Sequence, residues 1–151
     1  MSVPAIQLNM TGDKQFDTAA LKGKTWVLYF YPKDSTPGCT VEGGDFRDHL
    51  NSFLDEGVQV FGASRDSIKS HENFRSKQGY TFDLVSDPEE VLCEAFGVMK
   101  LKNMYGKQVR GIERSTFVIN TEGEIIKEWR GIKVPGHVEE VLTYVRTLKR
   151  Q

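Results

Sequence analysis

The fold is decided by the run Trp26-Val27-Leu28-Tyr29-Phe30-Tyr31-Pro32-Lys33-Asp34-Ser35-Thr36-Pro37-Gly38-Cys39-Thr40. Its first part, Trp26–Tyr31, is apolar throughout, which is typical of a central strand that is covered on both faces. Proline and glycine interrupt the second part, so the strand should end in a loop. A single thiol, Cys39, then lies where a helix should begin. The run therefore predicts a strand–loop–helix unit with a cysteine at the start of its helix.

The whole chain has the size and composition of one domain. Its 151 residues, 38% of them hydrophobic, can bury one core, so we expect a single domain over residues 1–151. The net charge of −1, with both signs interleaved, argues against a nucleic-acid or membrane partner. No apolar run approaches the ~20 residues that span a bilayer, and the first residues lack the pattern of a secretory signal. Two cysteines are too few for a disulfide framework and fit a reducing compartment, so we expect a cytoplasmic protein.

Strand and helix signals alternate along the chain. Strand composition marks the segments Trp26–Tyr31, Val58–Ala63, Phe82–Val85, Thr116–Ile119 and Glu124–Trp129. Crossovers through helices imply parallel strands, whereas the four-residue turn before Glu124 adds an antiparallel pair. The pattern predicts a thioredoxin-like α/β fold, in which a central mixed sheet is flanked by helices.

Four segments have helical periodicity or helix-end signals. The first follows Cys39, the second lies between Ser67 and Gly79, the third is a short helix expected to begin at Asp87-Pro88, and the fourth closes the chain. Their apolar or aligned residues are Phe46, Leu50, Phe53 and Leu54 in the first, Ile68, His71 and Arg75 in the second, Val91, Leu92, Ala95 and Phe96 in the third, and Val138, Val141, Leu142, Val145 and Leu148 in the fourth.

The position of Cys39 predicts a reactive thiol. With Thr36 as N-cap, Pro37 takes the first helical position and Cys39 the third, where a capping box holds a carboxylate. The unpaired N–H groups and positive dipole of a helix N-terminus favour a thiolate there. We expect the Thr36 hydroxyl to lie within reach of the sulfur, and Gly38 to leave room for a small oxidant. The alternative is that Cys39 is a small buried core residue.

Ionisation of the thiol alone does not make an efficient peroxidase, so hydrogen-bond donors must also hold the oxidant and stabilise the departing oxygen. Thr36 is one candidate donor. A second donor should be cationic and face the loop from another strand. Arg114 directly precedes the predicted strand Thr116–Ile119 and is the best-placed guanidinium for this role.

These residues resemble the peroxiredoxin family. Pro32, Thr36 and Cys39 match its active-site pattern, and Arg114-Ser115-Thr116-Phe117 looks like its distal arginine segment. The longer string from Phe30 to Glu42 is similar to the peroxiredoxin Q, or bacterioferritin comigratory protein, subfamily. Further matches are Ser64-Arg65-Asp66-Ser67, Ser86-Asp87-Pro88, Asn103-Met104-Tyr105-Gly106-Lys107 and Gly111-Ile112-Glu113-Arg114.

The resemblance implies a thioredoxin fold that reduces hydrogen peroxide and organic hydroperoxides without a metal or organic cofactor, in an antioxidant role in cell redox homeostasis. Cys39 would be the peroxidatic nucleophile that becomes a sulfenic acid. Thr36 would hydrogen-bond sulfur and peroxide, Arg114 would orient and polarise both, and Pro32 would shield the pocket. Glu42 would position Arg114; alternatively, it is only a partner for the helix dipole.

The chain departs from the subfamily in its second cysteine. Members often carry a resolving cysteine five or thirty-six residues after the nucleophile, and here those positions are Gly44 and Arg75. Cys93 is the remaining thiol, and we expect it to be a packing residue rather than a resolving thiol. The missing cysteines therefore predict a one-cysteine mechanism with an external thiol reductant. The resemblance implies that this reductant is thioredoxin or glutathione with glutaredoxin, and that the protein is a monomer.

Other readings stay open at this stage. A peroxide sensor that passes oxidation to a partner is the main alternative, and a thiol–disulfide oxidoreductase is disfavoured because position 36 is threonine. A zinc site is disfavoured because His49, His71 and His137 do not lie at ligand spacings from the cysteines. A Cys–His hydrolase built from Cys39 and His137 is disfavoured because we expect His137 near the start of the last helix. We interpret Lys100, Lys102 and Lys107 as a solvated loop, and Met99 and Met104 as exposed residues of a partner surface or as gap-filling core.

Overall fold

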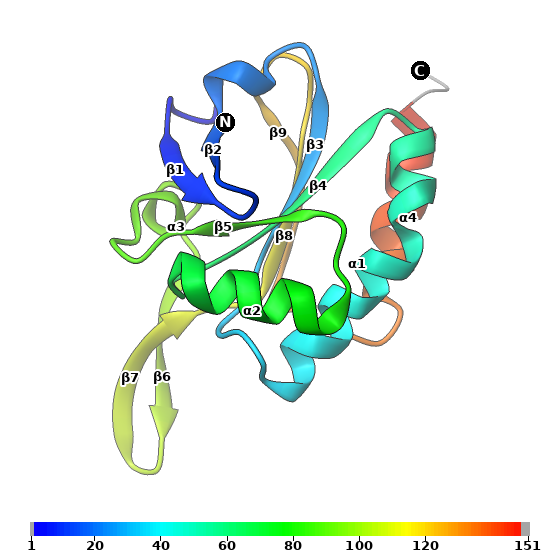
Figure 1. The fold of residues 1–151 in the computed structure, drawn as a ribbon. Helices are drawn as coiled ribbons and strands as arrows, with labels where there is room; N and C mark the ends of the chain where they lie inside the picture. The colour runs from blue at the N-terminus through cyan, green and yellow to red at the C-terminus, as the bar shows by residue number, and fades with distance from the viewer. Residues whose placement is uncertain (1, 149–151) are drawn as a thin grey trace.

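The computed structural model describes residues 2–148, which form a central twisted sheet with helices packed against it (Figure 1). The strand order within these residues is β2-β1-β5-β4-β3-β8-β9. The central strand β3 (Thr25–Phe30) pairs in parallel with β4 (Val58–Ser64) and antiparallel with β8 (Ser115–Ile119). β4 continues in parallel to β5 (Asp83–Ser86). The sheet is therefore mixed, with a parallel centre and antiparallel edges.

The remaining elements complete this sheet and its covering layers. The edge strands are β1 (Gln7–Met10), β2 (Lys14–Asp17) and β9 (Ile125–Arg130). The helices are η1 (Ala19–Leu21), α1 (Pro37–Asp55), α2 (Ile68–Gln78), α3 (Val91–Ala95) and α4 (His137–Leu148). A separate two-stranded hairpin consists of β6 (Met99–Met104) and β7 (Lys107–Ile112). None of the helices in residues 2–148 combines the length and apolarity that crossing a membrane requires.

The two faces of the sheet carry separate hydrophobic clusters. Along β3, Val27 and Tyr29 belong to the first cluster, whereas Leu28 and Phe30 belong to the second, because successive side chains point to opposite faces. Helices α1 and α4 supply most of the helical residues of the first cluster, and α3 contributes to the second. The central strands are buried on both sides, which explains why their sequences are apolar throughout.

The expected fold class is confirmed: the chain forms a mixed sheet flanked by helices. Each of the five expected strands forms, with ends within one residue of the prediction. Helix α1 begins at Pro37, directly after Thr36, as predicted. At α2 the side chain of Ser67 accepts a hydrogen bond from Ser70 N, and Gly79 ends the helix with a positive φ of 67°.

The start of α3 was predicted incorrectly. The helix begins at Val91 rather than at Pro88, because Pro88 and Glu89 form a turn and Glu90 has a positive φ of 63°. Asp87 still caps the helix, since its buried carboxylate accepts hydrogen bonds of 2.8 Å each from the backbone N–H groups of Val91 and Cys93. The aspartate was identified correctly, but the turn between it and the helix was not.

Two hairpins were not predicted, and the positions of some surface side chains differ from the expectation. The hairpins β1–β2 and β6–β7 were not predicted. Lys100, Lys102 and Lys107, which were expected in a loop, lie on β6 and β7. These strands are largely polar, so they lack the continuous apolar run that marks the central strands. Leu54 is 49% exposed and does not join the apolar face of α1. Met99 is partly buried against the second cluster, and the side chain of Met104 lies outside the described part of the chain.

Candidate active site

The candidate site lies where β3 ends and α1 begins. Cys39 occupies the third position of α1, after a loop in which Thr36 is extended with φ −87° and ψ 154°. The pairing of Phe30 with Ser115 places the residue before β8 beside the end of β3. That residue is Arg114, whose Nη2 donates to Cys39 Sγ across 3.5 Å. Sheet register and helix start therefore bring a thiol and a guanidinium together from positions 75 residues apart.

The guanidinium is fixed from its other side by Glu42, one turn further along α1. Arg114 Nη1 donates to Glu42 Oε1 across 2.7 Å, and the Glu42 side chain is fully buried. The second carboxylate oxygen, Oε2, is buried without a hydrogen-bond partner among the described residues. Burial raises the pKa of Glu42 to about 7, although the neighbouring Arg114 acts to lower it.

Arg114 remains a cation in this environment. Burial acts to lower the pKa of its guanidinium, but the Glu42 carboxylate and the Cys39 sulfur outweigh burial and raise it above the ordinary value. A charged donor that touches the sulfur would favour negative charge on an oxygen bound beside it. This is the electrostatic arrangement that an oxyanion-forming reaction needs.

Thr36 occupies the N-cap position, but its side chain does not cap the helix. Its hydroxyl donates to the carbonyl oxygen of Lys33 across 2.9 Å. The tight turn at Ser35, whose φ is 63°, accompanies this contact. The hydroxyl thus does not cap the helix in the described structure, and the expected contact of Thr36 with the sulfur and a bound peroxide stays a prediction. Because the proton is engaged, the Thr36 oxygen is left to accept a hydrogen bond from a bound molecule.

The thiol is far less accessible than the sequence analysis expected. Cys39 is only 2% exposed and belongs to the hydrophobic cluster on the first face of the sheet. The loop residues Pro32 and Thr36 and the helical Gly38 lie at the partly exposed rim beside it. The side chain of Arg114 is 17% exposed. The sulfur is thus buried, whereas the arginine that contacts it keeps some exposure to solvent.

Gly38 makes room for the guanidinium. A Cβ atom at this position would lie 3.0 Å from Arg114 Nη2, which is tighter than ordinary contact. The sequence analysis assigned this space to an approaching oxidant, whereas the structure fills it with the arginine that contacts the thiol. A larger residue at position 38 would therefore require the guanidinium to shift.

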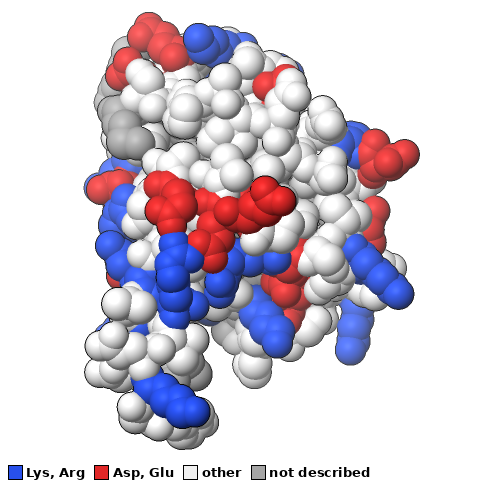
Figure 2. Space-filling model, turned by 90° about the vertical axis from the view of Figure 1, so that its left-hand side faces the viewer, with Lys and Arg blue, Asp and Glu red and all other residues white. Residues whose placement is uncertain are grey.

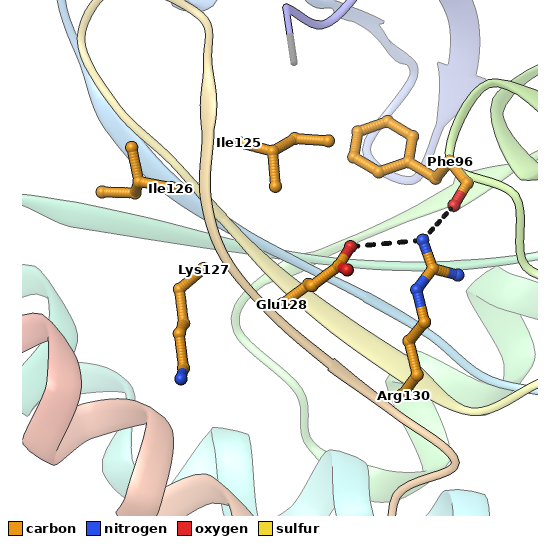
Figure 3. Close-up of a pocket in the computed structure, with 6 residues that line it drawn as sticks. All are labelled: Phe96, Ile125, Ile126, Lys127, Glu128 and Arg130. Carbon is orange, nitrogen blue, oxygen red and sulfur yellow. Dashed lines mark hydrogen bonds and ion pairs between the residues drawn. The ribbon is translucent and has the colours of Figure 1, made fainter.

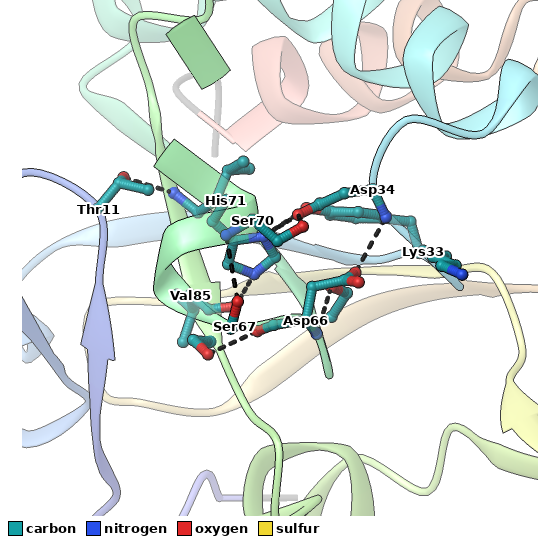
Figure 4. A network of polar contacts seen from close by, with 12 residues as sticks. Thr11, Lys33, Asp34, Asp66, Ser67, Ser70, His71 and Val85 are labelled. Carbon is teal, nitrogen blue, oxygen red and sulfur yellow. Dashed lines mark hydrogen bonds and ion pairs between the residues drawn. The ribbon is translucent and has the colours of Figure 1, made fainter. Parts of the chain in front are cut away.

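A buried polar network anchors the loop that precedes Cys39 (Figure 4). The carboxylate of Asp34 accepts hydrogen bonds from Tyr31 Oη at 2.6 Å and Ser70 Oγ at 2.7 Å, and lies 2.7 Å from His71 Nδ1. The backbone N–H of Asp34 donates to Asp66 Oδ2 across 2.9 Å. The loop is thus tied to the end of β4 and to α2, and sequence reasoning missed this role of Asp34.

The ligand atoms of Asp34, Asp66 and His71 lie within 4.8 Å of one another, a spacing that could hold a metal ion. Both oxygens of Asp34 and both ring nitrogens of His71 already have protein partners, and Nε2 faces the carbonyl of Val85 at 2.9 Å. Both ring nitrogens are thus engaged within the protein, Nδ1 by the Asp34 carboxylate and Nε2 by a backbone carbonyl. The cluster is better described as a buried hydrogen-bond network than as a vacant metal centre.

The other thiol and the remaining histidine candidate lie apart from this site. Cys93 is fully buried in the second cluster, on the opposite face of the sheet from Cys39. Burial, followed by the nearby Asp87 carboxylate, raises the pKa of the Cys93 thiol far above its usual range. His137 begins α4 and lies 2.9 Å from Thr116 Oγ1, and burial lowers its pKa to about 4. Within the described chain, His137 therefore forms no Cys–His pair with Cys39, and Cys93 does not contact Cys39.

One hollow of the described surface lies away from the thiol. It measures about 610 Å³ and lies along β9, lined by Phe96, Ile125, Ile126, Lys127, Glu128 and Arg130 (Figure 3). Arg130 pairs there with Glu128 and donates to the carbonyl of Phe96. Phe96 belongs to the second cluster, so this hollow neighbours the face that carries Cys93. Its groups are already paired and include no nucleophile, so the chemistry points to Cys39 instead.

Replacing Gly38 by alanine should separate activity from stability. We expect Gly38→Ala to push the guanidinium from the sulfur and to slow the reaction of Cys39 with hydrogen peroxide roughly tenfold, about 1.4 kcal/mol. Thermal stability should be unchanged or higher, because alanine is the better helix former. Stopped-flow fluorescence and a melting curve measure the two effects. The matched control is Gly44→Ala in the same helix, whose Cβ would meet Arg47 at 3.4 Å; equal rates in both variants would contradict the role of Gly38.

Glu42 should make stability fall as the pH rises. The native carboxyl holds its proton to about pH 7, whereas the unfolded chain releases it near 4.5. Between these values the native state binds more protons, so the free energy of unfolding decreases with increasing pH, by up to about 3 kcal/mol from this group. His137, with its lowered pKa, contributes the opposite slope from about pH 4 to 6.5.

Urea unfolding of the wild type and Glu42→Gln at several pH values isolates this contribution, because His137 is common to both proteins. The difference between the free energies of unfolding of the two proteins should grow from pH 4.5 to 7 and then level off. Exposed Glu122→Gln serves as control. Parallel curves for wild type and Glu42→Gln would show that the native Glu42 titrates at its ordinary value.

Comparisons with known proteins agree with the site. Residues 1–128 match the model of the AhpC/TSA family. Peroxiredoxin Bcp of Xanthomonas campestris pv. campestris is 52% identical over 146 residues, which cover 97% of this chain and 91% of that protein. The structure of Xanthomonas campestris Peroxiredoxin Q superimposes with a TM-score of 0.91 at 53% identity, covering 94% of this chain and 90% of that one.

A third similar protein is the Xanthomonas campestris Bacterioferritin Comigratory Protein, whose structure was studied for its alkyl peroxide reduction activity. It superimposes with a TM-score of 0.90 at 52% identity, again covering 94% of this chain and 90% of that one. The family match and these relatives extend over the loop, the thiol and the arginine described above. The chain belongs to the AhpC/TSA family and, within it, to the peroxiredoxin Q or Bcp group.

Proposed function

We propose that this protein is a thiol-dependent peroxidase in which Cys39 reduces hydrogen peroxide and organic hydroperoxides. The observation that carries the proposal is the contact of 3.5 Å between Cys39 Sγ and the guanidinium of Arg114 at the N-terminus of α1. A thiolate in this place has a cationic donor beside it, ready for an oxygen that gains negative charge. The similarity to a protein studied for alkyl peroxide reduction supports the same substrate class here.

The first step oxidises the sulfur of Cys39. Its thiolate attacks one oxygen of the hydroperoxide, so the S–O bond forms as the O–O bond breaks. The sulfur loses two electrons and becomes sulfenic acid, while the departing hydroxide or alkoxide takes up a proton and leaves as water or alcohol. Arg114 stabilises the negative charge on the oxygens during this step, and Glu42 holds the guanidinium in position.

Thr36 and Pro32 complete the proposed site. The hydroxyl of Thr36 already donates to the carbonyl of Lys33, so its oxygen can accept the hydrogen bond of a peroxide O–H group. Pro32 lies at the partly exposed rim of the loop and limits the entry of water. Because Cys39 is 2% exposed, the peroxide enters through a small movement of this loop.

The second step needs an external thiol. The sheet separates Cys39 from Cys93, and a disulfide requires Cα atoms within roughly 7 Å. Cys93 is moreover a buried thiol whose raised pKa keeps it protonated and unreactive. These features support a one-cysteine mechanism with thioredoxin, or glutathione and glutaredoxin, as reductant. A thiol of the reductant attacks the sulfenic acid and forms a mixed disulfide with loss of water. A second thiol then attacks the reductant's sulfur in this disulfide and releases Cys39.

The same observation favours one alternative function. A sulfenic acid without a resolving thiol on its own face of the sheet could persist and pass its oxidation to a partner protein. The protein would then act as a peroxide sensor or relay. A thiol–disulfide oxidoreductase is disfavoured, because residue 36 is threonine where such an enzyme needs its second cysteine.

The cellular setting is proposed on the same basis. Two free cysteines fit a reducing compartment such as the cytoplasm, where a peroxidase would serve as an antioxidant in redox homeostasis. We propose that residues 1–151 form one thioredoxin-like domain that acts as a monomer, without metal or organic cofactor.

Peroxide consumption with different reductants tests the proposal. With dithiothreitol, thioredoxin, or glutathione plus glutaredoxin, the wild type should complete many turnovers with at least one reductant. Cys39→Ser should abolish turnover, because the nucleophile is lost, and Cys93→Ser should retain it within about twofold.

Mass spectrometry of protein treated with limiting peroxide gives the control. The expected product is sulfenic acid on Cys39, trapped by dimedone. A main product with a Cys39–Cys93 disulfide would refute the one-cysteine mechanism. A single stoichiometric turnover with every reductant would favour the sensor instead of the peroxidase.

A further inference from the structure

The hairpin β6–β7 stands apart from the rest of the molecule. It forms its own two-stranded sheet and projects from the same edge at which α1 begins (Figure 1). A turn at Tyr105 and Gly106, both with positive φ, closes its tip. A hairpin of only two strands is marginally stable in water. The side chains that it exposes along its length are therefore not explained by packing and call for another explanation. Tyr105 is fully exposed and Leu101 is 67% exposed.

The strand register gathers lysines on one face of this hairpin. In this register Lys100 pairs with Gly111, Lys102 with Val109 and Met104 with Lys107. Alternation along each strand therefore places Lys100, Lys102, Lys107 and Val109 on the same face, which we call the lysine face. Val109 is 43% exposed within it. The opposite face carries Met99 and Ile112, whose side chains pack on the second cluster at the root of the hairpin.

The charge of the hairpin contrasts with that of the whole chain. Its strands hold four of the 20 basic residues, and none of the 21 acidic residues lies between Met99 and Ile112. Figure 2 shows Lys and Arg side chains on the projecting hairpin, with acidic side chains gathered above its root. Two acidic neighbours of the root, Glu90 and Glu94, are paired with Arg110 on the other face. The lysine face is thus a local positive surface on a protein whose net charge is −1.

The root of the hairpin lies beside the candidate site, to which it is connected once along the chain and once through hydrogen bonds. Ile112 at the end of β7 is followed, after one residue, by Arg114, which contacts Cys39. On the other side, Arg65 Nη2 approaches the carbonyl oxygen of Arg110 at 3.5 Å, and the adjacent Asp66 accepts the backbone N–H of the loop that precedes Cys39. A protein that rested on the hairpin would therefore lie next to the thiol.

We propose that the lysine face docks an acidic protein dithiol that reduces oxidised Cys39. The inference rests on the proposed function, because it supplies the reductant that a one-cysteine peroxidase requires. Positive charge around an apolar centre favours a protein with an acidic surface and steers its approach, whereas a small uncharged thiol gains nothing from it. Three lysines around the exposed Val109, with the exposed Tyr105 at the tip of the hairpin, suit a protein surface better than a bare polyanion.

The reaction that docking serves is a two-electron reduction. One thiolate of the partner attacks the sulfur of the Cys39 sulfenic acid, so an S–S bond forms, the S–O bond breaks, and the hydroxide leaves as water after taking up a proton. The second thiolate of the partner attacks the partner's own sulfur in this mixed disulfide. Cys39 leaves as a thiolate, and the partner carries away the two electrons' worth of oxidation as its internal disulfide.

Charge reversal on the lysine face tests the proposal. In the variant Lys100→Glu/Lys102→Glu/Lys107→Glu, kcat/KM for an acidic bacterial thioredoxin should fall at least tenfold, and the corresponding triple change to Gln should have a smaller effect. The wild-type value should decrease when NaCl rises from 50 to 300 mM, and the Glu variant should lose this dependence. Turnover with dithiothreitol and the rate of Cys39 oxidation by peroxide should stay within twofold, which also shows that the variants are folded.

The matched control reverses three exposed lysines away from the hairpin, Lys22, Lys24 and Lys127, and should retain thioredoxin-driven kcat/KM within twofold. Equal losses in both triple variants would overturn the docking surface, as would an unchanged kcat/KM in the hairpin variant. Wild-type turnover with dithiothreitol but not with thioredoxin would also refute this proposal while leaving the peroxidase intact. Absence of peroxide consumption with every reductant would instead refute the proposed function, and the docking proposal with it.

Discussion

One shared guanidinium organises the site on which the rest of this account depends. Arg114 donates through one nitrogen to the buried carboxylate of Glu42 and through the other to the sulfur of Cys39. Burying a carboxylate without a cation costs free energy. The ion pair therefore compensates the charge of Glu42 and also holds Arg114 in place. The first two turns of α1 supply both partners of the guanidinium, and Gly38, directly before Cys39, leaves the space that it fills. The backbone thus presents a charged donor at a defined place beside a thiol.

The sheet determines what this thiol can do after it has reacted. Alternation of side chains across β3 and β8 divides the core into two clusters, with Cys39 in one and Cys93 in the other. An internal disulfide would require that division to be broken, so regeneration depends on another molecule. The loop that covers Cys39 is in turn held by Asp34, through Tyr31, Ser70 and Asp66. The anchored loop and the separated thiols together favour a protein that reacts with small oxidants and is restored by a partner.

Much of this arrangement could be predicted from the sequence, because it depends on local and strong signals. The apolar run before Pro32 and the cap at Thr36-Pro37 located the central strand and the helix, and hence Cys39. Arg114 was found because it precedes an apolar strand. What the sequence could not show depends on distant pairing: the Asp34–His71 contact joins residues 37 apart, and the Thr36 hydroxyl turns to Lys33 because of the backbone at Ser35. The polar hairpin β6–β7 carries no apolar periodicity, so its lysines looked like a loop.

The most direct test of the central claim is the second-order rate constant for oxidation of Cys39 by hydrogen peroxide in Arg114→Ala and Arg114→Lys, followed by stopped-flow fluorescence. Loss of the charged donor beside the sulfur should slow Arg114→Ala by roughly 10²–10³-fold, about 3–4 kcal/mol, as expected for removal of an oxyanion-stabilising group. Arg114→Lys should recover only part of the rate, because lysine cannot reach Glu42 and the sulfur with two separate nitrogens. Rates within a few-fold of the wild type in both variants would show that other groups activate the thiol.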